Sequence, residues 1–332
     1  MTQESPREIG GYLEMETYHG REYHPGLYAL NLGRTAITWF FRKVGARKVW
    51  IPCFLCGSVI EALENEGFEL RRYFIRPDLY PASESLPRTP LSETEWLLVL
   101  NNYGQLEDSY IKACANLYGN VLFDYTHAFI QTPVPGTNVV YSVRKFLGVT
   151  DGAYLQTEKP IRMPEETDAS HTRCAHILGR YEESASAHYQ EMLDNAHGYE
   201  GAQAKKMSPL TQNLLRSFDY EWIKTRRMEN YQMLDSLLGG KNPLEIEGFL
   251  RTPAAGPFCY PFYADKGTEI RRRLAARKIY IPTYWSNVLR DMPEDTLEHR
   301  YAANILALPC DQRYGTSDMK EVAEAVMEEL EK

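Results

Sequence analysis

Residues suited to covalent chemistry occur at two places in the first half of the chain. Asp124 ends the apolar run VLFD, and Lys145 follows the apolar run VVYS by three positions. A lysine amine can form a Schiff base with an aldehyde, and an anionic carboxylate can hold a pyridine nitrogen protonated. Taken alone, a lysine in a turn is usually solvated, and an aspartate at such a position can simply cap a helix. Their meaning therefore depends on whether the fold brings them together.

The first half of the chain alternates between strand-like and helix-like segments. Apolar runs predict buried strands of the parallel type, and segments with helical apolar spacing lie between them. The predicted strands cover residues 27–32, 48–52, 68–75, 96–101, 120–124 and 138–142, and the predicted helices cover 33–45, 57–67 and 109–119. Such alternation predicts an α/β fold with a mainly parallel sheet covered by helices on both faces.

From about residue 165 the pattern changes to long amphipathic helices. The longest candidate, over residues 210–240, is expected to break near Ser217–Tyr220. A strand over 258–264, a helix, a further strand and a closing helix follow. We therefore expect a large α/β domain with an N-terminal arm over residues 1–165. Long connecting helices and a smaller C-terminal α+β domain are expected over 166–332.

The predicted sheet places several polar residues at one edge. Ligands of open α/β sheets bind beyond the carboxyl ends of the strands, and the residues at or just past such ends are Gly33, Asn101, Asp124, Ser142 and Lys145. Gly33 also opens a helix, and the free N–H groups of a helix N-terminus bind phosphate. An amine, a carboxylate and a helix N-terminus at one edge suit pyridoxal phosphate (PLP), which carries an aldehyde, a pyridine nitrogen and a phosphate.

The order and spacing of six segments resemble the DegT/DnrJ/EryC1/StrS family. The segments are ALNLGRTAI, KVWIPCFLCGSVIEAL, NNYGQ, LFDYTHA, YSVRKFLGVTDGAYL and ILALPCDQRY, and the resemblance covers about residues 9–330. Members of this family are fold-type I PLP enzymes, many of them aminotransferases that act on nucleotide-linked keto sugars. The resemblance implies a seven-stranded-type sheet, PLP as cofactor, and a homodimer with shared active sites. The aromatic-rich segment GGYLEMETYHGREYHPGLY is the candidate for reaching across to the partner.

The resemblance assigns roles residue by residue. Lys145 matches the lysine that forms the Schiff base and moves protons, and Asp124 matches the aspartate paired with the pyridinium nitrogen. His127 matches a Gln or His beside the phenolic oxygen of the cofactor. Ser142 matches a serine that reaches the phosphate. The turn over the phosphate corresponds to Gly33 and Arg34, with Thr35 as a hydroxyl donor.

The chain departs from the family pattern at several of these positions. Leu32-Gly33-Arg34 stands where Ser-Gly-Thr is commoner, and Cys56 stands where an aromatic residue usually stacks on the cofactor ring. A soft thiol can still pack on a ring face, with Phe54 or Tyr103 as alternative stacking residues. Asn102 replaces a frequent His before Tyr-Gly. We expect the substrate to contact Asn102, Tyr103 and Trp285, although core packing is an equal use for Trp285.

Composition excludes several other classes of protein. The net charge of the chain is −8 and no basic stripe occurs, so nucleic acid is not an expected partner. No apolar run has membrane-spanning length and no signal-peptide core begins the chain, which predicts a cytoplasmic protein without membrane contact. The scattered cysteines are expected to be free thiols: Cys53, Cys56, Cys114, Cys174, Cys259 and Cys310. The C-x-x-C pair has no second pair to complete a zinc site, so no metal is expected.

The favoured function is a PLP-dependent aminotransferase. By resemblance, it would move an amino group from glutamate or glutamine to a nucleotide-linked keto sugar or a similar small carbonyl compound. A decarboxylase, aldolase or lyase reaction on the same cofactor, cysteine desulfuration included, and a non-catalytic PLP-binding homologue remain alternatives. The donor carboxylate needs a cationic partner, for which arginine is the usual choice, and the candidates are Arg34, Arg144 and Arg313.

Overall fold

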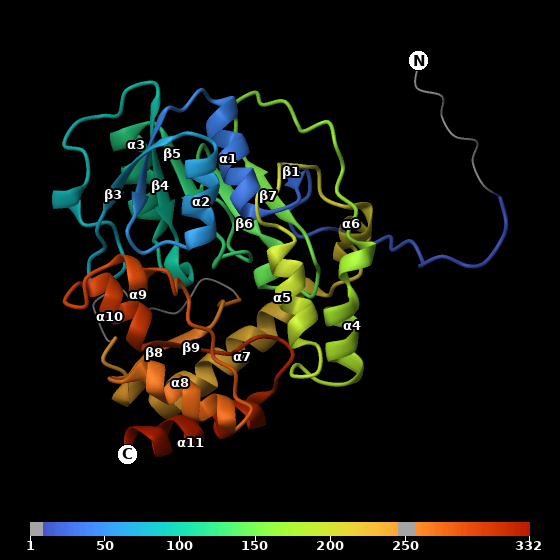
Figure 1. Cartoon of the computed structure of the whole chain (residues 1–332), viewed down its shortest axis with the longest axis vertical. Coiled ribbons are helices and arrows are strands. Elements are labelled where there is room, and N and C mark those ends of the chain that lie inside the picture. The colour runs from blue at the N-terminus through green and yellow to red at the C-terminus, as the bar shows by residue number, and fades with distance from the viewer. Residues whose placement is uncertain (1–8, 245–255) are drawn as a thin grey trace.

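The structure is a computed structural model that describes residues 9–244 and 256–332 (Figure 1). Its largest feature is a seven-stranded sheet in the order β1-β7-β6-β5-β4-β2-β3. The strands are β1 Tyr28–Leu30, β2 Lys48–Pro52, β3 Glu69–Tyr73, β4 Glu95–Leu100, β5 Val121–Asp124, β6 Asn138–Ser142 and β7 Ala153–Gln156. All neighbours from β3 to β6 pair in parallel, whereas β7 is antiparallel to both β6 and β1. The predicted mainly parallel sheet is confirmed.

The register of the central strands brings their polar ends together. Leu100 of β4 pairs with Asp124 of β5, and Asp124 pairs with Val140 of β6. The Asn101 backbone N–H donates to the Asp124 carbonyl at 2.9 Å. The apolar residues before these ends are fully buried, because both faces of a parallel sheet are covered. The polar side chains at the carboxyl ends therefore lie where these strands leave the apolar core.

Helices α1 (Gly33–Lys43), α2 (Gly57–Asn65) and α3 (Asp108–Tyr118) cover the sheet. The chain runs from β2 through α2 to β3 in one direction across the sheet, and from β4 through α3 to β5 in the other. Because crossovers are right-handed, these two helices must cover opposite faces; α2 lies in front of the sheet and α3 behind it in Figure 1. Helix α1 ends two residues before its predicted end, since Gly45 turns the chain with φ +74°.

The second half of the chain is mainly helical. Its elements are α4 Ala175–Glu182, α5 Tyr189–His197, α6 Pro209–Leu215, α7 Tyr220–Leu238, β8 Tyr260–Tyr263, α8 Gly267–Ala276, α9 Val288–Asp291, α10 Leu297–Asn304, β9 Ile305–Leu308 and α11 Thr316–Leu330. The predicted break near 217–220 is confirmed, because α6 ends at Leu215 and α7 begins at Tyr220. The Asp219 side chain caps α7 by accepting from the Trp222 N–H at 2.9 Å.

A second apolar core lies away from the large sheet. Strands β8 and β9 pair in antiparallel fashion, and helices α7, α8 and α11 pack around them at the lower end of Figure 1. Its fully buried side chains include Leu234, Phe262, Leu274, Leu306 and Val326. Within the described ranges, no helix is long and apolar enough to cross a membrane.

Candidate active site

The N-terminus of α1 lies against two hydroxyl groups at the carboxyl edge of the sheet. A Cβ atom built on Gly33 would lie 3.6 Å from the Ser142 Cβ, 3.9 Å from the Ser142 Oγ and 3.9 Å from the Thr126 Oγ1. The free N–H groups of the first helical turn and both hydroxyls therefore share one small space. With the positive end of the helix dipole, this arrangement can hold a phosphate.

Thr35 uses its hydroxyl inside the start of α1. The Thr35 Oγ1 donates to the Asn31 Oδ1 at 2.7 Å, and Asn31 Oδ1 also accepts from the Leu32 N–H at 3.0 Å. The backbone N–H of Thr35 is therefore what this residue offers to a phosphate. Arg34, on the first turn of the same helix, is half-buried.

Asp124 is a buried carboxylate with one oxygen fully used. Its Oδ1 accepts from the Thr126 N–H at 2.8 Å and from the Thr126 hydroxyl at 2.5 Å. Burial raises the pKa of Asp124, and the two Thr126 bonds and the Lys145 charge oppose that shift. Among residues 9–244 and 256–332, no group hydrogen-bonds to the Oδ2. A buried acceptor in this state matches the protonated nitrogen of a pyridine ring.

Lys145 ends the short 3₁₀ turn η3 (Val143–Lys145), directly after β6. The residue is exposed, yet protein surrounds its amine closely enough that burial is the first cause that lowers its pKa. The charges of Arg144 and Arg34 lower the Lys145 pKa further, while Cys56 and Asp124 raise it. Its Nζ lies 5.3 Å from the centroid of the Tyr284 ring. The lowered pKa increases the unprotonated fraction, which is the form that attacks a carbonyl carbon.

His127 lies in a stack of aromatic rings. Its ring is 4.1 Å from that of Phe258 with an interplanar angle of 12°, and 5.4 Å from that of Tyr103. Burial, and then the Lys145 charge, hold the pKa of His127 well below its usual value, so the imidazole is neutral. Tyr284 and Trp285 also lie within 5.3 Å and 5.1 Å of the His127 ring.

The residues proposed to stack on a cofactor ring differ in exposure. Phe54 is fully buried and packs on Trp285 at 4.5 Å, so both rings belong to the core as well as to this edge of the site. Cys56 is exposed and precedes α2, close enough to affect the Lys145 pKa. Its Sγ lies 3.2 Å from the Ser58 hydroxyl. Of these residues, Cys56 has the most accessible side chain.

All six cysteines are free thiols, as predicted, so Cys53 and Cys56 do not form a disulfide. Within the part of the chain that the structure describes, no group of His, Cys, Asp or Glu could hold a metal ion. Asn102 and Tyr103 lie in the turn η2 (Asn102–Gly104), where Tyr103 adopts φ +53°. Both are buried, and the Asn102 Oδ1 has no hydrogen-bond partner in the described residues.

The sequence reasoning missed three residues of this region. Thr126 follows Asp124 by two positions, and that spacing is a local signal for a hydroxyl bonded to the carboxylate. Tyr284 and Asn287 come from a distant segment that carries no comparable signal. Asn287 accepts from the Gly57 N–H at 2.9 Å and donates to the Leu55 carbonyl at 3.1 Å, which holds this segment against the start of α2.

The candidate arginines differ in their partners. Arg313 donates to both carboxylate oxygens of Asp311, from Nε at 2.7 Å and from Nη2 at 2.9 Å. Neither Arg34 nor Arg144 has a carboxylate within ion-pair distance among the described residues. Arg313 is therefore already neutralised, whereas the other two carry a charge without a partner.

Comparison with known proteins identifies the fold. No protein-family model matches the chain, and no curated protein matches it by sequence. Solved structures do match: a DegT DnrJ EryC1 StrS aminotransferase from Brucella abortus is 13% identical with TM-score 0.59, and covers 92% of this chain and 86% of its own. Helicobacter pylori PseC, an aminotransferase involved in the biosynthesis of pseudoaminic acid, is 14% identical with TM-score 0.61, over 91% and 86%. NtdA from Bacillus subtilis, with bound cofactor PMP, is 14% identical with TM-score 0.62, over 92% and 73%.

These matches define the class of the fold. The chain has the mixed α/β fold of the fold-type I PLP aminotransferases, with the same large sheet over most of its length. More narrowly, this is the fold of the DegT/DnrJ/EryC1/StrS aminotransferases that the sequence resembles.

Proposed function

We propose that this protein is a PLP-dependent aminotransferase. The observation that carries the proposal is the joint placement of the Lys145 amine, the unbonded Asp124 Oδ2 and the α1 N-terminus at one edge of the sheet. Each matches a different part of one cofactor. The fold shared with a PMP-bound aminotransferase supports the same choice.

Different residues of this chain are proposed to contact the phosphate, the ring nitrogen and the aldehyde of the cofactor. The amides that begin α1, with Gly33 beside the Ser142 hydroxyl, hold the phosphate. Asp124 keeps a proton on the ring nitrogen, because its buried charge is stabilised by pairing with that cation. The Lys145 amine would hold the cofactor covalently and, once free, would move a proton at the substrate carbon. When bound, the cofactor supplies an aldehyde and an electron-accepting ring.

Two residues are candidates for contact with the cofactor ring and its phenolic oxygen. Cys56 is exposed at the start of α2, where its polarizable sulfur can pack on the ring. Neutral His127, held between Tyr103 and Phe258, is placed to accept or donate a hydrogen bond at the phenolic oxygen. Asn102 and Trp285 complete the expected lining on the substrate side.

Glutamate or glutamine is the proposed amino donor, and a nucleotide-linked keto sugar or similar carbonyl compound is the proposed acceptor. The similarity to an aminotransferase of pseudoaminic acid biosynthesis supports a sugar acceptor. A cytoplasmic location is part of the same proposal.

A homodimer with shared active sites is also part of the proposal. Large apolar side chains are exposed near the N-terminus, where Tyr12 is 97% and Leu13 is 93% exposed, and on α4, where Tyr181 is 92% exposed. Exposed apolar groups of this size are usually covered by a partner. A C2 dimer would cover both sets at once.

The amino-donor half-reaction tests the function. Protein loaded with PLP and mixed with glutamate, without acceptor, should lose the visible absorbance of the lysine-bound cofactor and release one equivalent of 2-oxoglutarate. A keto acid or 4-keto sugar nucleotide should restore the absorbance. Release of carbon dioxide or cleavage of an amino acid, without any 2-oxo acid, would favour a decarboxylase or lyase instead.

A further inference from the structure

Arg144 carries a charge that nothing in the described residues balances. It precedes Lys145 in the turn η3 and is half-buried. Within residues 9–244 and 256–332 its guanidinium makes no hydrogen bond and no ion pair; its contact is with the ring of Tyr199, whose centroid lies 4.8 Å from the Arg144 Cζ. A guanidinium has five N–H donors, and partly burying them without acceptors is costly.

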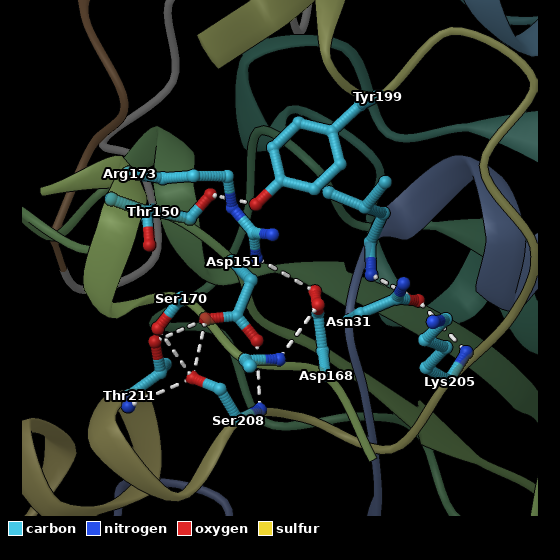
Figure 2. Close-up of polar contacts among 12 residues, drawn as sticks. Asn31, Thr150, Asp151, Asp168, Ser170, Arg173, Tyr199, Lys205, Ser208 and Thr211 are labelled. Atoms are coloured by element: carbon cyan, nitrogen blue, oxygen red, sulfur yellow. Dashed lines mark hydrogen bonds and ion pairs between the residues drawn. The ribbon is translucent and has the colours of Figure 1, made fainter. Parts of the chain in front are cut away.

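Arg173 provides a direct comparison on the same ring. Its Cζ also lies 4.8 Å from the Tyr199 centroid, but its Nη2 donates to the Asp168 Oδ2 at 2.9 Å (Figure 2). The Tyr199 hydroxyl donates to the Thr150 carbonyl at 2.9 Å, so the ring has a fixed position. Both arginines therefore contact the Tyr199 ring, and of the two only Arg144 lacks a carboxylate partner within the described residues.

Like charges surround this guanidinium. Burial lowers the pKa of Arg144, and the charges of Arg34 and Arg173 lower it further, whereas Tyr199 and Asp151 raise it. Burial lowers the pKa of His176, and the charge of Arg144 lowers it further. Asp151 is occupied elsewhere, since its carboxylate accepts from the Ser208 N–H and hydroxyl, each at 2.8 Å. A cationic excess remains next to the reactive amine.

We propose that Arg144 is the binding site for the carboxylate of the amino donor. The planar guanidinium, whose Cζ lies 4.8 Å from the centroid of the Tyr199 ring, carries an N–H fork that suits a bidentate contact with a carboxylate. Arg144 adjoins Lys145 in the turn η3, and after burial its charge is among those that lower the Lys145 pKa, so a carboxylate bound at Arg144 would lie in the neighbourhood of the lysine amine. This inference rests on the proposed aminotransferase function and names the residue that recognises its donor.

Apart from Arg34, which lies on the first turn of α1 at the proposed phosphate site, other places for the anion have fewer open donors. The cofactor phosphate has its own donors in the backbone N–H groups at the start of α1 and in the Ser142 hydroxyl. The cavity of about 380 Å³ beside Tyr199 contains paired charges, because Lys205 pairs with Glu166 at 2.8 Å as Arg173 does with Asp168. Arg313 is bound to Asp311.

Binding of glutarate to the PLP-loaded protein tests the proposal, because this dicarboxylate lacks an amino group and cannot react. Isothermal titration calorimetry should give a Kd at least tenfold weaker for Arg144→Gln than for the wild type. Arg144→Lys keeps the charge but loses the planar fork, and it should fall between them. The matched control is the double variant Arg173→Gln/Asp168→Asn, which removes a balanced pair from the same ring and should change the Kd less than twofold.

Two further measurements separate the possible failures. Titration with PLP and with pyridoxal, which has no phosphate, should give affinities within about threefold of wild type in Arg144→Gln. A tenfold loss for PLP alone would assign Arg144 to the cofactor phosphate and overturn the proposal. Unchanged glutarate binding in both Arg144 variants, or no glutarate binding by the loaded wild type, would also overturn it. If the wild type fails to bind PLP at all, the proposed function itself fails.

Discussion

Arg227 of α7 holds the backbone carbonyl of Phe146, the residue that follows Lys145. The Arg227 Nη2 donates to the Phe146 O at 3.1 Å, and the Arg227 Cζ lies 4.5 Å from the Phe146 ring centroid. The same buried guanidinium donates to the Pro257 carbonyl at 2.9 Å, and Gln312 adds a second bond to the Phe146 O at 2.9 Å. One arginine therefore ties the lysine turn to the segments that flank the second core.

Replacing Arg227 should damage both stability and the reactivity of Lys145. Arg227→Met removes the guanidinium donor of the Pro257 carbonyl and one of the two donors to the Phe146 carbonyl, which we expect to cost roughly 2–4 kcal/mol of unfolding free energy. The turn should also shift, so that PLP binds Lys145 at least tenfold more slowly at temperatures where the variant is folded. Urea unfolding and stopped-flow absorbance measure the two effects.

Arg271 offers the matched control. It is another buried arginine whose guanidinium donates to backbone carbonyls, those of Ile305 at 3.0 Å and Ala303 at 2.7 Å, but it does not touch the lysine turn. Arg271→Met should lose comparable stability and keep the wild-type rate of PLP binding. Equal slowing in both variants would mean that Arg227 acts through stability alone.

Asp124→Asn should separate electronic function from packing. Because Asn keeps the shape and loses the charge, we expect turnover to fall by orders of magnitude and cofactor binding to weaken less. Near-normal turnover would mean that Asp124 has only a structural role, as the acceptor of the hydrogen bond from the Thr126 N–H.

The cofactor-free protein gives the same residue a second, independent test. Burial raises the pKa of Asp124 above its unfolded value, so its ionisation destabilises the folded state as pH rises through the folded pKa. Cofactor-free Asp124→Asn should then be more stable than wild type at pH 7, and the difference should shrink toward pH 4. A variant less stable than wild type at neutral pH would contradict this.

His24 should make the protein sensitive to mild acid. Its ring is buried, donates from Nε2 to the Phe129 carbonyl at 2.7 Å and stacks on Tyr141 at 4.1 Å. Burial lowers the pKa of His24 to about 4, below its unfolded value of 6.5. The folded state binds fewer protons than the unfolded state between these values, so about 3 kcal/mol of stability should be lost as pH falls through that range.

His24→Phe isolates this contribution. The variant lacks a titrating group at the position, so its unfolding free energy should depend less steeply on pH between 6.5 and 4 than that of the wild type. Chemical denaturation at a series of pH values gives the comparison. Parallel curves would show that His24 does not control acid stability.

Removing residues 1–14 should affect assembly while leaving the fold of each subunit intact. The deletion takes away Tyr12 and Leu13, yet keeps the anchor in which Asn213 accepts from the Tyr18 N–H and donates to the Glu16 carbonyl. We expect light scattering to report a weaker dimer and activity to fall in proportion. A wild-type protein that is monomeric and fully active would contradict the shared-site proposal.

Much of the fold could be predicted from local pattern. The strands at 48–52 and 138–142 have the predicted bounds, because continuous apolar runs between polar ends leave little choice of boundary. Strand β7 was not predicted, since its four residues follow Gly152 at φ +123° without an apolar run of their own length. The division into domains at residue 165 stays a prediction.

The places of the candidate site residues in the fold could be predicted where they depend on strand ends, and could not where they depend on distant contacts. Asp124 and Lys145 could be placed because each follows a buried strand. The contact of Arg144 with Tyr199, and that of Lys145 with Tyr284, join segments that no local pattern connects. Thr35 illustrates a further limit, since its hydroxyl is bonded to Asn31, whose amide the sequence alone does not orient.

Covalent trapping of the cofactor tests the central claim most directly. The protein should be loaded with PLP, reduced with borohydride, digested and examined by peptide mass spectrometry, with Lys145→Ala as the control. We expect the reduced cofactor on the peptide that contains Lys145, and no trapped cofactor in the variant. Trapping on another lysine, or equal trapping in Lys145→Ala, would contradict it.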